Sequence, residues 1–306
     1  MMNLHTDRNA FSDIVDTVSE KTGFARDIIE KDYYVTMILK EFFNEEKGLV
    51  FKGGTSLSKA YHLINRFSED IDLNYIDHDE LNRKKRKEIK YALKDVTDRC
   101  GLIISNFENT RSNRDFNRYE IEYEKSSPLS GILKSNVIVE VAYQERSYPC
   151  EKSMINSLIG EYLIDMGRQD IIDLFDLKPF EVTVQNYKRT FIDKMFAICD
   201  YYLSDTISEH SRHLYDLYKI QPMIVFDNSF RQLFEQVKVE RSKSRICLSA
   251  VSEKKIPDLL KEIIEHDIYK RDYEQRTSTL LSDNVSYEET IKGLKQTIVI
   301  LDEMDL

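Results

Sequence analysis

The chain has 306 residues, 41% of them hydrophobic, with 18 Tyr and 15 Phe, so it can bury one large core or two ordinary ones. Its net charge of −10 arises from 44 basic and 54 acidic residues, which excludes a protein that coats nucleic acid but not a local basic patch. Four cysteines without a CxxC pair indicate neither a disulfide framework nor a zinc knuckle, and we expect them to be reduced thiols.

The start of the chain and its hydropathy indicate where the protein works. The first residues, MMNLHTDR, lack the apolar run of a signal peptide, and no apolar stretch approaches the roughly 18 residues that a membrane span needs. We therefore expect a cytoplasmic protein with no membrane partner. Only nine Gly and five Pro are present, which favours a helix-rich chain with short connections.

Residues 7–46 show the apolar spacing of two helices, with a break near Thr22 and Gly23. In the second helix, Lys31 and Asp32 interrupt the apolar stripe. Such a pair is ordinarily a solvated or salt-bridged part of a helix surface, but a lysine near a glycine loop could also help to hold that loop. The sequence leaves both interpretations open.

A strand at residues 48–51 runs into two adjacent glycines. Gly53 and Gly54 can adopt positive φ and carry no Cβ, so a phosphate group can approach their backbone N–H groups closely. Thr55 and Ser56 are residue types that cap a helix, and we expect a helix to begin there and to end near residue 64. The pattern predicts a phosphate-binding turn.

Two aspartates follow at residues 70–73, where acidic and apolar residues alternate. On a strand, Asp70 and Asp72 share one face, while Ile71 and Leu73 are buried on the other. Neighbouring carboxylates repel one another unless a cation lies between them, and Mg²⁺ prefers such oxygen ligands together with substrate phosphates. The strand therefore predicts a metal site close to the phosphate-binding turn.

A helix is predicted at residues 82–97, and it carries the densest basic run of the chain, RKKRK at residues 83–87, followed by Lys90 and Lys94. A basic run on a helix is ordinarily a solvated surface, and the alternative is a patch that contacts a phosphate backbone. Few aromatic residues are interleaved with the run to add base stacking. Both interpretations stay open.

Two alternating segments, residues 102–107 and 118–123, predict a hairpin with a polar turn between them. A further strand at residues 136–142 is apolar on both faces except for Glu140. A carboxylate in a central strand should be paired, metal-bound or protonated, because burial of an isolated charge is costly. We expect Glu140 to complete a metal-binding triad with the two aspartates, and Glu122 is the alternative third carboxylate.

After Pro149 the pattern is helical almost to the end of the chain, apart from a short strand-like segment at residues 180–184. The predicted helices span residues 154–163, 187–203, 208–220, 230–241, 257–269 and 287–304. Two of these helices carry the charged residues Lys194 and Asp216. Considered alone, each would be interpreted as an ordinary charge on the surface of a helix.

Five sequence motifs occur in a fixed order along most of the chain and are best interpreted as one set. They are IEKDYY at residues 29–34, FKGGTSLSK at 51–59, RFSEDIDL at 66–73, RTFIDK at 189–194 and RHLYDLY at 212–218. This set resembles the AbiEii/AbiGii toxin family of nucleotidyltransferases, within the DNA polymerase β-like superfamily. The resemblance implies an α+β fold with a polymerase β-like mixed sheet core and N-terminal helices at residues 1–165. A mostly helical domain at residues 166–306 would complete the active cleft.

The resemblance also implies that a nucleotide is transferred from an NTP, with Mg²⁺, or Mn²⁺ as an alternative, as the cofactor. Asp70 and Asp72 would bind the metal, with Glu140 as the third ligand. Lys194 and Asp216 match residues of the family's active cleft, which makes these five the expected catalytic residues. The expected nucleotide-binding residues are Gly53, Gly54, Thr55, Ser56, Lys59, Arg66, Ser68 and Lys194. One departure is Asp193, where the family usually has Glu.

Members of this family act as toxins of two-gene toxin–antitoxin systems, often protecting bacteria from phage by abortive infection, and some modify the acceptor end of tRNA. We therefore expect a toxin that transfers NMP to an RNA acceptor, with tRNA as the first candidate. Its partner would be a cognate antitoxin, either a protein that binds it or one that acts without direct contact. Two alternatives stay open: a non-catalytic module that binds NTP and Mg²⁺ and acts through a protein partner, and nucleotidyl transfer to a protein hydroxyl.

Overall fold

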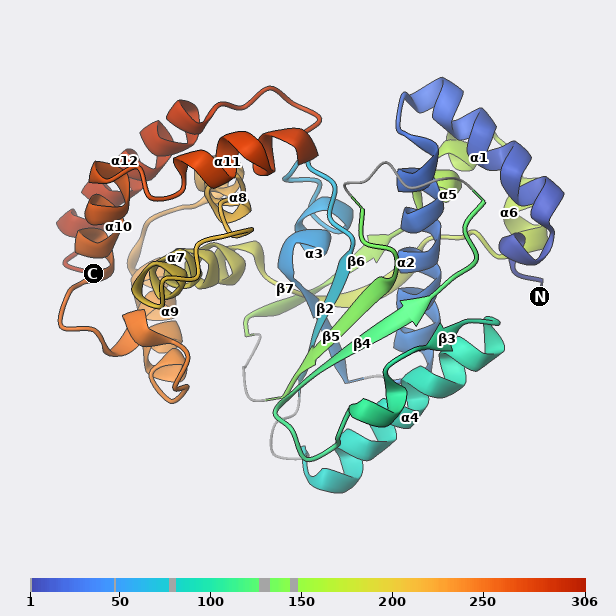
Figure 1. Cartoon of the computed structure of the whole chain (residues 1–306), viewed down its shortest axis with the longest axis horizontal. Coiled ribbons are helices and arrows are strands. Elements are labelled where there is room, and N and C mark those ends of the chain that lie inside the picture. The colour runs from blue at the N-terminus through green and yellow to red at the C-terminus, as the bar shows by residue number, and fades with distance from the viewer. Residues whose placement is uncertain (1, 47, 77–80, 127–132, 144–147) are drawn as a thin grey trace. The chain divides into compact units, whose positions relative to one another are not determined.

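The computed structural model describes residues 2–46, 48–76, 81–126, 133–143 and 148–306 (Figure 1). These residues form two compact units. The first unit contains the described residues of 1–60, 68–146 and 150–184, and the second contains those of 61–67, 147–149 and 185–306. The expected boundary after residue 165 therefore lies inside the first unit.

A mixed sheet forms the centre of the first unit. Its seven strands within the described part of the chain are, in spatial order, β3 (Ile103–Ile104), β4 (Phe116–Glu122), β5 (Val137–Ala142), β2 (Asp70–Tyr75), β1 (Leu49–Lys52), β7 (Phe180–Gln185) and β6 (Cys150–Ile155). β2 is parallel to β5 and antiparallel to β1, β1 is parallel to β7, and β4 is antiparallel to both β3 and β5. The mixed sheet with surrounding helices confirms the predicted α+β class.

Helices cover the apolar face of this sheet (Figure 1). α2 (Arg26–Glu45) packs against β2 and β5, and its helical neighbours are α1 (Arg8–Thr22), α4 (Arg83–Arg99) and α5 (Leu158–Asp165), with α6 (Gln169–Phe175) on α5. The shared core includes the fully buried side chains of Ile38, Leu39, Phe42, Ile71, Leu73, Val139 and Val141. Because strand side chains alternate, burial of Ile71 and Leu73 directs Asp70 and Asp72 to the opposite face.

One predicted helix start is wrong. The helix expected from Thr55 or Ser56 is α3, which spans Gly53–Lys59 and has Lys52 in the capping position. The reason is Gly53, whose φ of 77° turns the chain into the helix directly after β1. Thr55 and Ser56 consequently lie inside the helix and are buried.

A strand was also missed. Residues 150–155 form β6, so the helix expected from residue 154 begins only at Leu158. β6 lies at the edge of the sheet and most of its side chains are exposed or half-buried; Met154, for example, is 57% exposed. Such a strand lacks the alternation of apolar and polar residues on which the prediction depended.

The second unit is helical. α7 (Tyr187–Leu203) packs with α8 (Arg212–Ile220), α9 (Asn228–Arg241) and α10 (Ile256–Glu265), and α12 (Tyr287–Glu303) packs with α8, α10 and α11 (Lys270–Gln275). The segment Tyr61–Phe67 belongs to this unit, because the Phe67 amide donates to the Leu280 carbonyl at 3.2 Å and the Ser282 amide to the Asn65 carbonyl at 2.8 Å. Short 3-10 helices in the chain are Leu4–Thr6, Phe107–Asn109, Gln221–Met223, Leu248–Val251 and Thr277–Leu280.

None of the helices in the described residues combines the length and hydrophobicity that crossing a bilayer requires.

Candidate active site

Charged side chains form a row across four strands on the sheet face opposite α2. The strand register pairs Lys52 of β1 with Asp72 of β2, and Asp72 with Glu140 of β5. Glu140 is in turn paired with Arg118 of β4. Since adjacent strands are about 5 Å apart, the two acids at the centre of the row are close neighbours. Two carboxylates thus lie between two cations.

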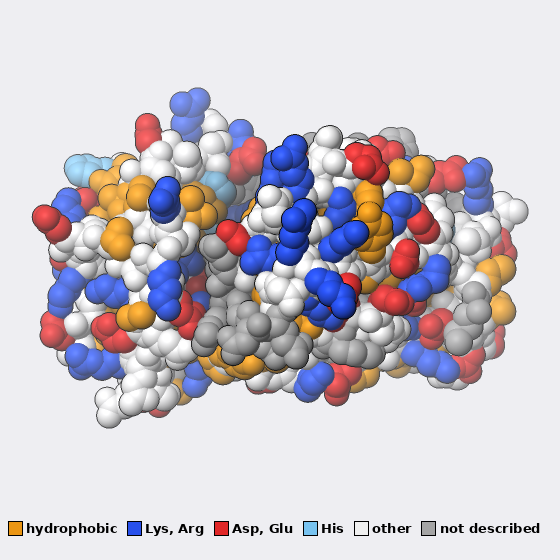
Figure 2. Space-filling view, turned by 90° about the horizontal axis from the view of Figure 1, so that it is seen from below, with side chains coloured by type: hydrophobic (Ala, Val, Ile, Leu, Met, Phe, Trp, Pro, Cys, Tyr) orange, Lys and Arg blue, Asp and Glu red, His pale blue; other side chains and the backbone are white. Residues whose placement is uncertain are grey.

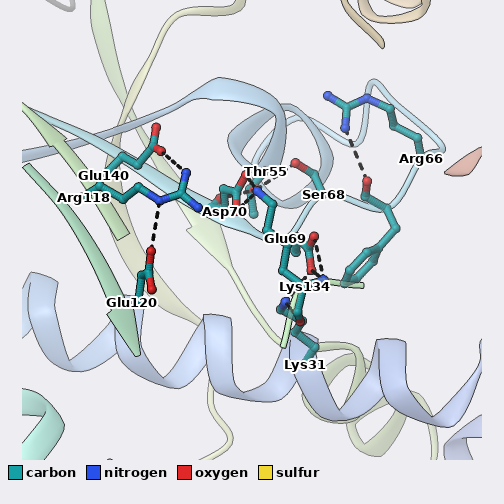
Figure 3. Close-up of polar contacts among 11 residues, drawn as sticks. Lys31, Thr55, Arg66, Ser68, Glu69, Asp70, Arg118, Glu120, Lys134 and Glu140 are labelled. Carbon is teal, nitrogen blue, oxygen red and sulfur yellow. Dashed lines mark hydrogen bonds and ion pairs between the residues drawn. The ribbon is translucent and has the colours of Figure 1, made fainter. Parts of the chain in front are cut away.

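The third acid, Asp70, lies on the same strand face, two residues before Asp72. Its partner is Lys134, whose Nζ lies 2.9 and 2.6 Å from the two carboxylate oxygens (Figure 3). The fully buried Lys31 of α2 donates to the backbone carbonyl of Lys134 at 2.6 Å and pairs with Glu69. Burial lowers the pKa of Lys31, and the charge of Glu69 partly offsets this effect. The network holds the residues before β5 against the start of β2.

Asp32, which follows Lys31 on α2, holds two other elements. It accepts a hydrogen bond from the Leu158 amide at 2.7 Å and pairs with Lys59 of α3. Lys59 Nζ also donates to the Asn156 carbonyl at 3.2 Å, so this predicted nucleotide-binding residue is directed towards α2 and the start of α5. The salt-bridged interpretation of the Lys31–Asp32 interruption is confirmed, and both residues are buried.

Glu140 shows the effect of crowding acids together. Its side chain is 26% exposed, and Arg118 Nη1 lies 3.2 Å from its Oε1. Burial raises the pKa of Glu140 and the charges of Asp72 and Asp70 raise it further, whereas Arg118 and Lys134 lower it. The contributions of Asp72 and Asp70, which come after that of burial, indicate that the acids repel one another, a condition that a bound cation relieves.

The chemistry of these donors fits a divalent metal. Asp70, Asp72 and Glu140 all offer hard carboxylate oxygens, and Asp70 already attracts the ammonium group of Lys134. In their present positions, no three Asp, Glu, His or Cys side chains among the described residues are grouped closely enough to hold a metal ion. A metal held by these three acids would require their side chains to move from these positions and Lys134 to leave Asp70.

The glycine turn touches the carboxylates through Gly53. Its φ of 77° is in the left-handed region, and a Cβ added there would lie 1.9 Å from Asp72 Oδ2. No other residue type fits beside Asp72 without moving it. The next residue, Gly54, is buried in the first turn of α3. The backbone of the turn is therefore placed directly against a predicted metal ligand.

The hydroxyls that follow the glycines stabilise the turn. The Thr55 hydroxyl donates to the Asp70 carbonyl, and its Oγ1 lies 2.9 Å from the Ser68 hydroxyl. The Ser56 hydroxyl donates to the Gly53 carbonyl at 2.9 Å. Thr55 and Ser56 thus fix α3 against the start of β2, and Ser68 lies beside Thr55 at the same place.

The other predicted residues form a buried ionic cluster in the second unit, which we call the Asp216 cluster: Arg66, Lys194 and Asp216. Asp216 accepts from Nε and Nη2 of Arg66 and from Nζ of Lys194, all at 2.7 Å. Burial alone would raise the pKa of Asp216, but the charges of Arg66 and then Lys194 hold it well below its usual range. Burial lowers the pKa of Lys194 and of His213, whose Nδ1 lies 3.3 Å from Lys194 Nζ. Two cations here share one carboxylate.

The predicted residues are thus collected into two groups. The acids and the glycine turn lie together in the first unit, and the Asp216 cluster lies in the second. Glu122, the alternative third acid, is exposed on β4 and is paired with Ile103 of β3, whereas Glu140 is directly beside Asp72. The register therefore favours Glu140.

Three cations of this face were not among the predicted site residues: Lys52, Arg118 and Lys134. The signal for Arg118 was present, since it lies at an alternate position of a predicted strand, but its contact with Glu140 depends on the pairing of β4 with β5. Lys134 precedes β5 and gave no local signal, because only the folded chain brings it to Asp70.

A mixed sheet on which a glycine turn touches one of two alternating aspartates, with a third acid on the next strand, is the arrangement expected of a nucleotidyltransferase. Residues 38–292 match the family described as nucleotidyl transferase AbiEii toxin, type IV toxin–antitoxin system. The chain belongs to this family, and it is an NTP-dependent nucleotidyltransferase toxin of a type IV toxin–antitoxin system, which implies a cognate antitoxin.

Solved structures agree on the fold. The chain is similar to MenT4, the nucleotidyltransferase toxin Rv2826c from Mycobacterium tuberculosis H37Rv, with a TM-score of 0.56 and 15% sequence identity over 94% of this chain and 89% of that one. No curated protein sequence matches the chain.

Proposed function

We propose that this toxin transfers NMP from an NTP to a hydroxyl of an RNA acceptor, with tRNA as the first candidate and Mg²⁺ held by Asp70, Asp72 and Glu140. One observation carries the proposal: the register that places Asp72 beside Glu140, with the backbone of Gly53 against Asp72. A phosphate bound by the backbone of this turn would therefore adjoin a group of oxygen ligands. Mn²⁺ is the alternative metal.

In the proposed reaction the acceptor oxygen forms a bond to the α-phosphorus of the NTP. The bond from that phosphorus to the oxygen that bridges the α- and β-phosphates breaks, and pyrophosphate leaves. The proton of the acceptor hydroxyl passes to water. Such chemistry depends chiefly on positioning and charge stabilisation. When bound, the metal would neutralise charge on the phosphates and activate the attacking oxygen. The glycine turn would accept the phosphates, supported by Thr55, Ser56 and Ser68, while Arg118 positions Glu140.

Lys134 and the Asp216 cluster supply the cations in this proposal. Lys134 neutralises Asp70 until a metal takes its place, and its ammonium group is then free to approach the triphosphate. Lys194 remains the predicted contact for phosphate charge, and Asp216 is the residue that holds it. Lys59, which pairs with Asp32, would support α3 rather than touch the nucleotide.

The decisive experiment incubates the purified protein with each α-³²P-labelled NTP, Mg²⁺ and total RNA. We expect label in tRNA, loss of that label in Asp72→Asn, and retention of it in Glu122→Gln, which removes the charge of an exposed acid on the same sheet. Label in protein instead of RNA would favour transfer to a protein hydroxyl. Tight NTP binding without label in any macromolecule would favour the non-catalytic alternative.

We also propose that the toxin works in the cytoplasm, where NTPs and tRNA are found, as part of a phage-defence system. Expression should arrest growth, and co-expression of the neighbouring antitoxin gene should relieve the arrest. Cells that carry the pair should survive phage infection as a population better than cells that carry Asp72→Asn. Equal survival of both populations would argue against a defence role without affecting the proposed chemistry.

A further inference from the structure

A basic surface in the first unit plays no part in the chemistry proposed above. We define it as five exposed cations: Arg83, Lys84 and Lys87 at the start of α4, and Arg111 and Arg114 in the loop before β4. Figure 2 views the molecule from the side on which α4 lies in Figure 1, and Lys and Arg side chains gather on that face. The basic run of the sequence is therefore only part of a larger patch.

The loop is fixed to α4 by two other basic residues of the same helix. Arg86 Nη1 donates to the Arg114 carbonyl at 3.2 Å and pairs with Asp115 at 2.9 Å. The buried Lys90 donates from Nζ to the carbonyls of Phe107 at 2.8 Å and Thr110 at 2.7 Å. Arg86 and Lys90 thus fix the loop to α4. The exposed cations of the helix and those of the loop are therefore held in one connected region.

The charge of the basic surface is not balanced locally. Arg83, Lys87, Arg111 and Arg114 form no ion pair with any residue that the structure describes. Lys84 Nζ is 3.9 Å from the exposed Glu88, a distance and an exposure at which an ion pair contributes little. In a protein with a net charge of −10, such a group of cations does not follow from overall composition. Its charge is available to an external anion.

Two exposed aromatic rings accompany the cations, which corrects the impression from the sequence that aromatic residues are lacking. Tyr91 is 47% exposed and Phe116 is 48% exposed. Lys87 Nζ lies 5.6 Å from the centre of the Tyr91 ring. Phe116 follows the loop as the first residue of β4, and strand alternation places it on the same face as Arg118. Exposed rings of this kind can stack on nucleic-acid bases.

We propose that the basic surface, together with Tyr91 and Phe116, binds the RNA acceptor. In this arrangement the cations contact the phosphates of the RNA. Phe116 stacks on one of its bases where the RNA approaches the carboxylates. Arg118, which contacts Glu140, is two residues further along β4, about 7 Å at the usual rise of a strand. This inference rests on the proposed function in one respect only, that RNA is the acceptor. The combination of cations with stacking rings that lead to the acids favours RNA over an anionic lipid surface.

The test measures binding of fluorescently labelled bulk tRNA to the full chain across a salt series. The double variant Lys87→Gln/Arg111→Gln is compared with Lys292→Gln/Lys295→Gln, which neutralises two exposed lysines of α12. Each phosphate contact to a single strand adds about 0.7 to the slope of log K against log salt, so the first variant should lower the slope by about 1.4 and the second should not change it. Phe116→Ala should weaken binding about tenfold and Phe116→Tyr should restore it.

The outcomes separate this inference from the proposed function. Equal salt slopes for both double variants and the wild type would overturn the inference even if tRNA became labelled in the transfer assay. A reduced slope for the first variant would support it even if label were transferred to protein instead. Asp72→Asn should bind tRNA at least as tightly as the wild type. Binding to phosphatidylglycerol vesicles that the first variant loses, with no binding to tRNA, would also overturn it. Thermal unfolding of each variant verifies that these exposed substitutions leave the fold intact.

Discussion

The carboxylates of the sheet and the Asp216 cluster balance their charges in opposite ways. On the sheet, three acids share cations that lie at the surface, and the pKa of Glu140 is raised by burial and by its acidic neighbours. In the Asp216 cluster one carboxylate is shared by two cations, and its pKa is lowered although it is completely buried. The first group holds acids close to one another, and the second surrounds a single acid with cations.

This difference shows which group is ready for an external ligand. A crowded, partly exposed set of acids gains stability when a cation arrives, whereas a buried and satisfied set gains nothing and loses much when one member is removed. We therefore expect substitutions on the sheet to change activity more than stability, and substitutions in the cluster to change stability first.

The largest expected effect is on activity. Asp72→Asn removes a predicted metal ligand and should reduce nucleotidyl transfer about a thousandfold, since metal-based charge stabilisation is worth several kcal/mol. Its urea midpoint should stay within experimental scatter of the wild type, because loss of one acid relieves repulsion. Transfer assays and urea unfolding are the measurements, and Glu122→Gln is the control. An active Asp72→Asn would contradict the assignment of the sheet as the metal site.

Asp216→Ala should have the largest effect on stability. It leaves Arg66 and Lys194 buried without their shared acid, a change that typically costs about 3–5 kcal/mol. Urea unfolding of this variant and of Asp70→Ala should give a much larger loss for Asp216. If both substitutions lowered the free energy of unfolding equally, the proposed contrast between the two groups would fail.

A pair of glycine substitutions separates backbone strain from contact with the site. Gly53 and Gly23 have φ of 77° and 78°, so alanine at either position should cost about 1–2 kcal/mol. Only at Gly53 does the new Cβ meet Asp72, since nothing lies within 4 Å of a Cβ at Gly23. We expect the backbone strain at both positions but a larger stability loss from Gly53→Ala, and a loss of transfer activity from Gly53→Ala alone. Equal activities would show that the turn does not position Asp72.

Lys134→Gln should have a smaller effect. The Lys134 side chain is 38% exposed, so its ion pair with Asp70 should contribute less than about 1 kcal/mol to stability. Without the competing ammonium group, the Mg²⁺ concentration for half-maximal activity should fall a few-fold. An unchanged Mg²⁺ requirement would show that Lys134 does not compete with the metal. A rise in the KM for NTP would show in addition that Lys134 contacts the triphosphate.

The smallest effect is a dependence on pH. Burial, followed by the charge of Lys194, lowers the pKa of His213 well below 6.5 in the folded chain. The unfolded chain binds the proton near pH 6.5 and the folded chain does not, so this stabilisation is complete above that pH and is lost as the pH falls. His213→Gln should reduce the slope of unfolding free energy against pH between 7 and 5 by up to about 1.4 kcal/mol per unit. His5 and His210 also have lowered pKa values through burial, so some slope should remain. An unchanged slope would contradict this account of His213.

Much of the first unit could be predicted from local pattern. The break at Gly23, the strands that carry the acids and the common face of Asp70 and Asp72 follow from periodicity over a few residues, which the chain obeys. The start of α3 was predicted wrongly, because the φ that Gly53 adopts depends on its close approach to Asp72. The strand β6 was missed, because an exposed edge strand has no buried face to impose alternation.

By itself the sequence determined which chemical groups the protein carries, in what order, and which pairs of them share a strand face, because these properties depend on neighbours along the chain. Only the tertiary structure decided that Glu140 rather than Glu122 lies beside Asp72, and that Lys134 lies against Asp70. Those choices depend on strand order and register. Both are set by how the apolar faces of α2 and the sheet pack together, and no local pattern contains that information.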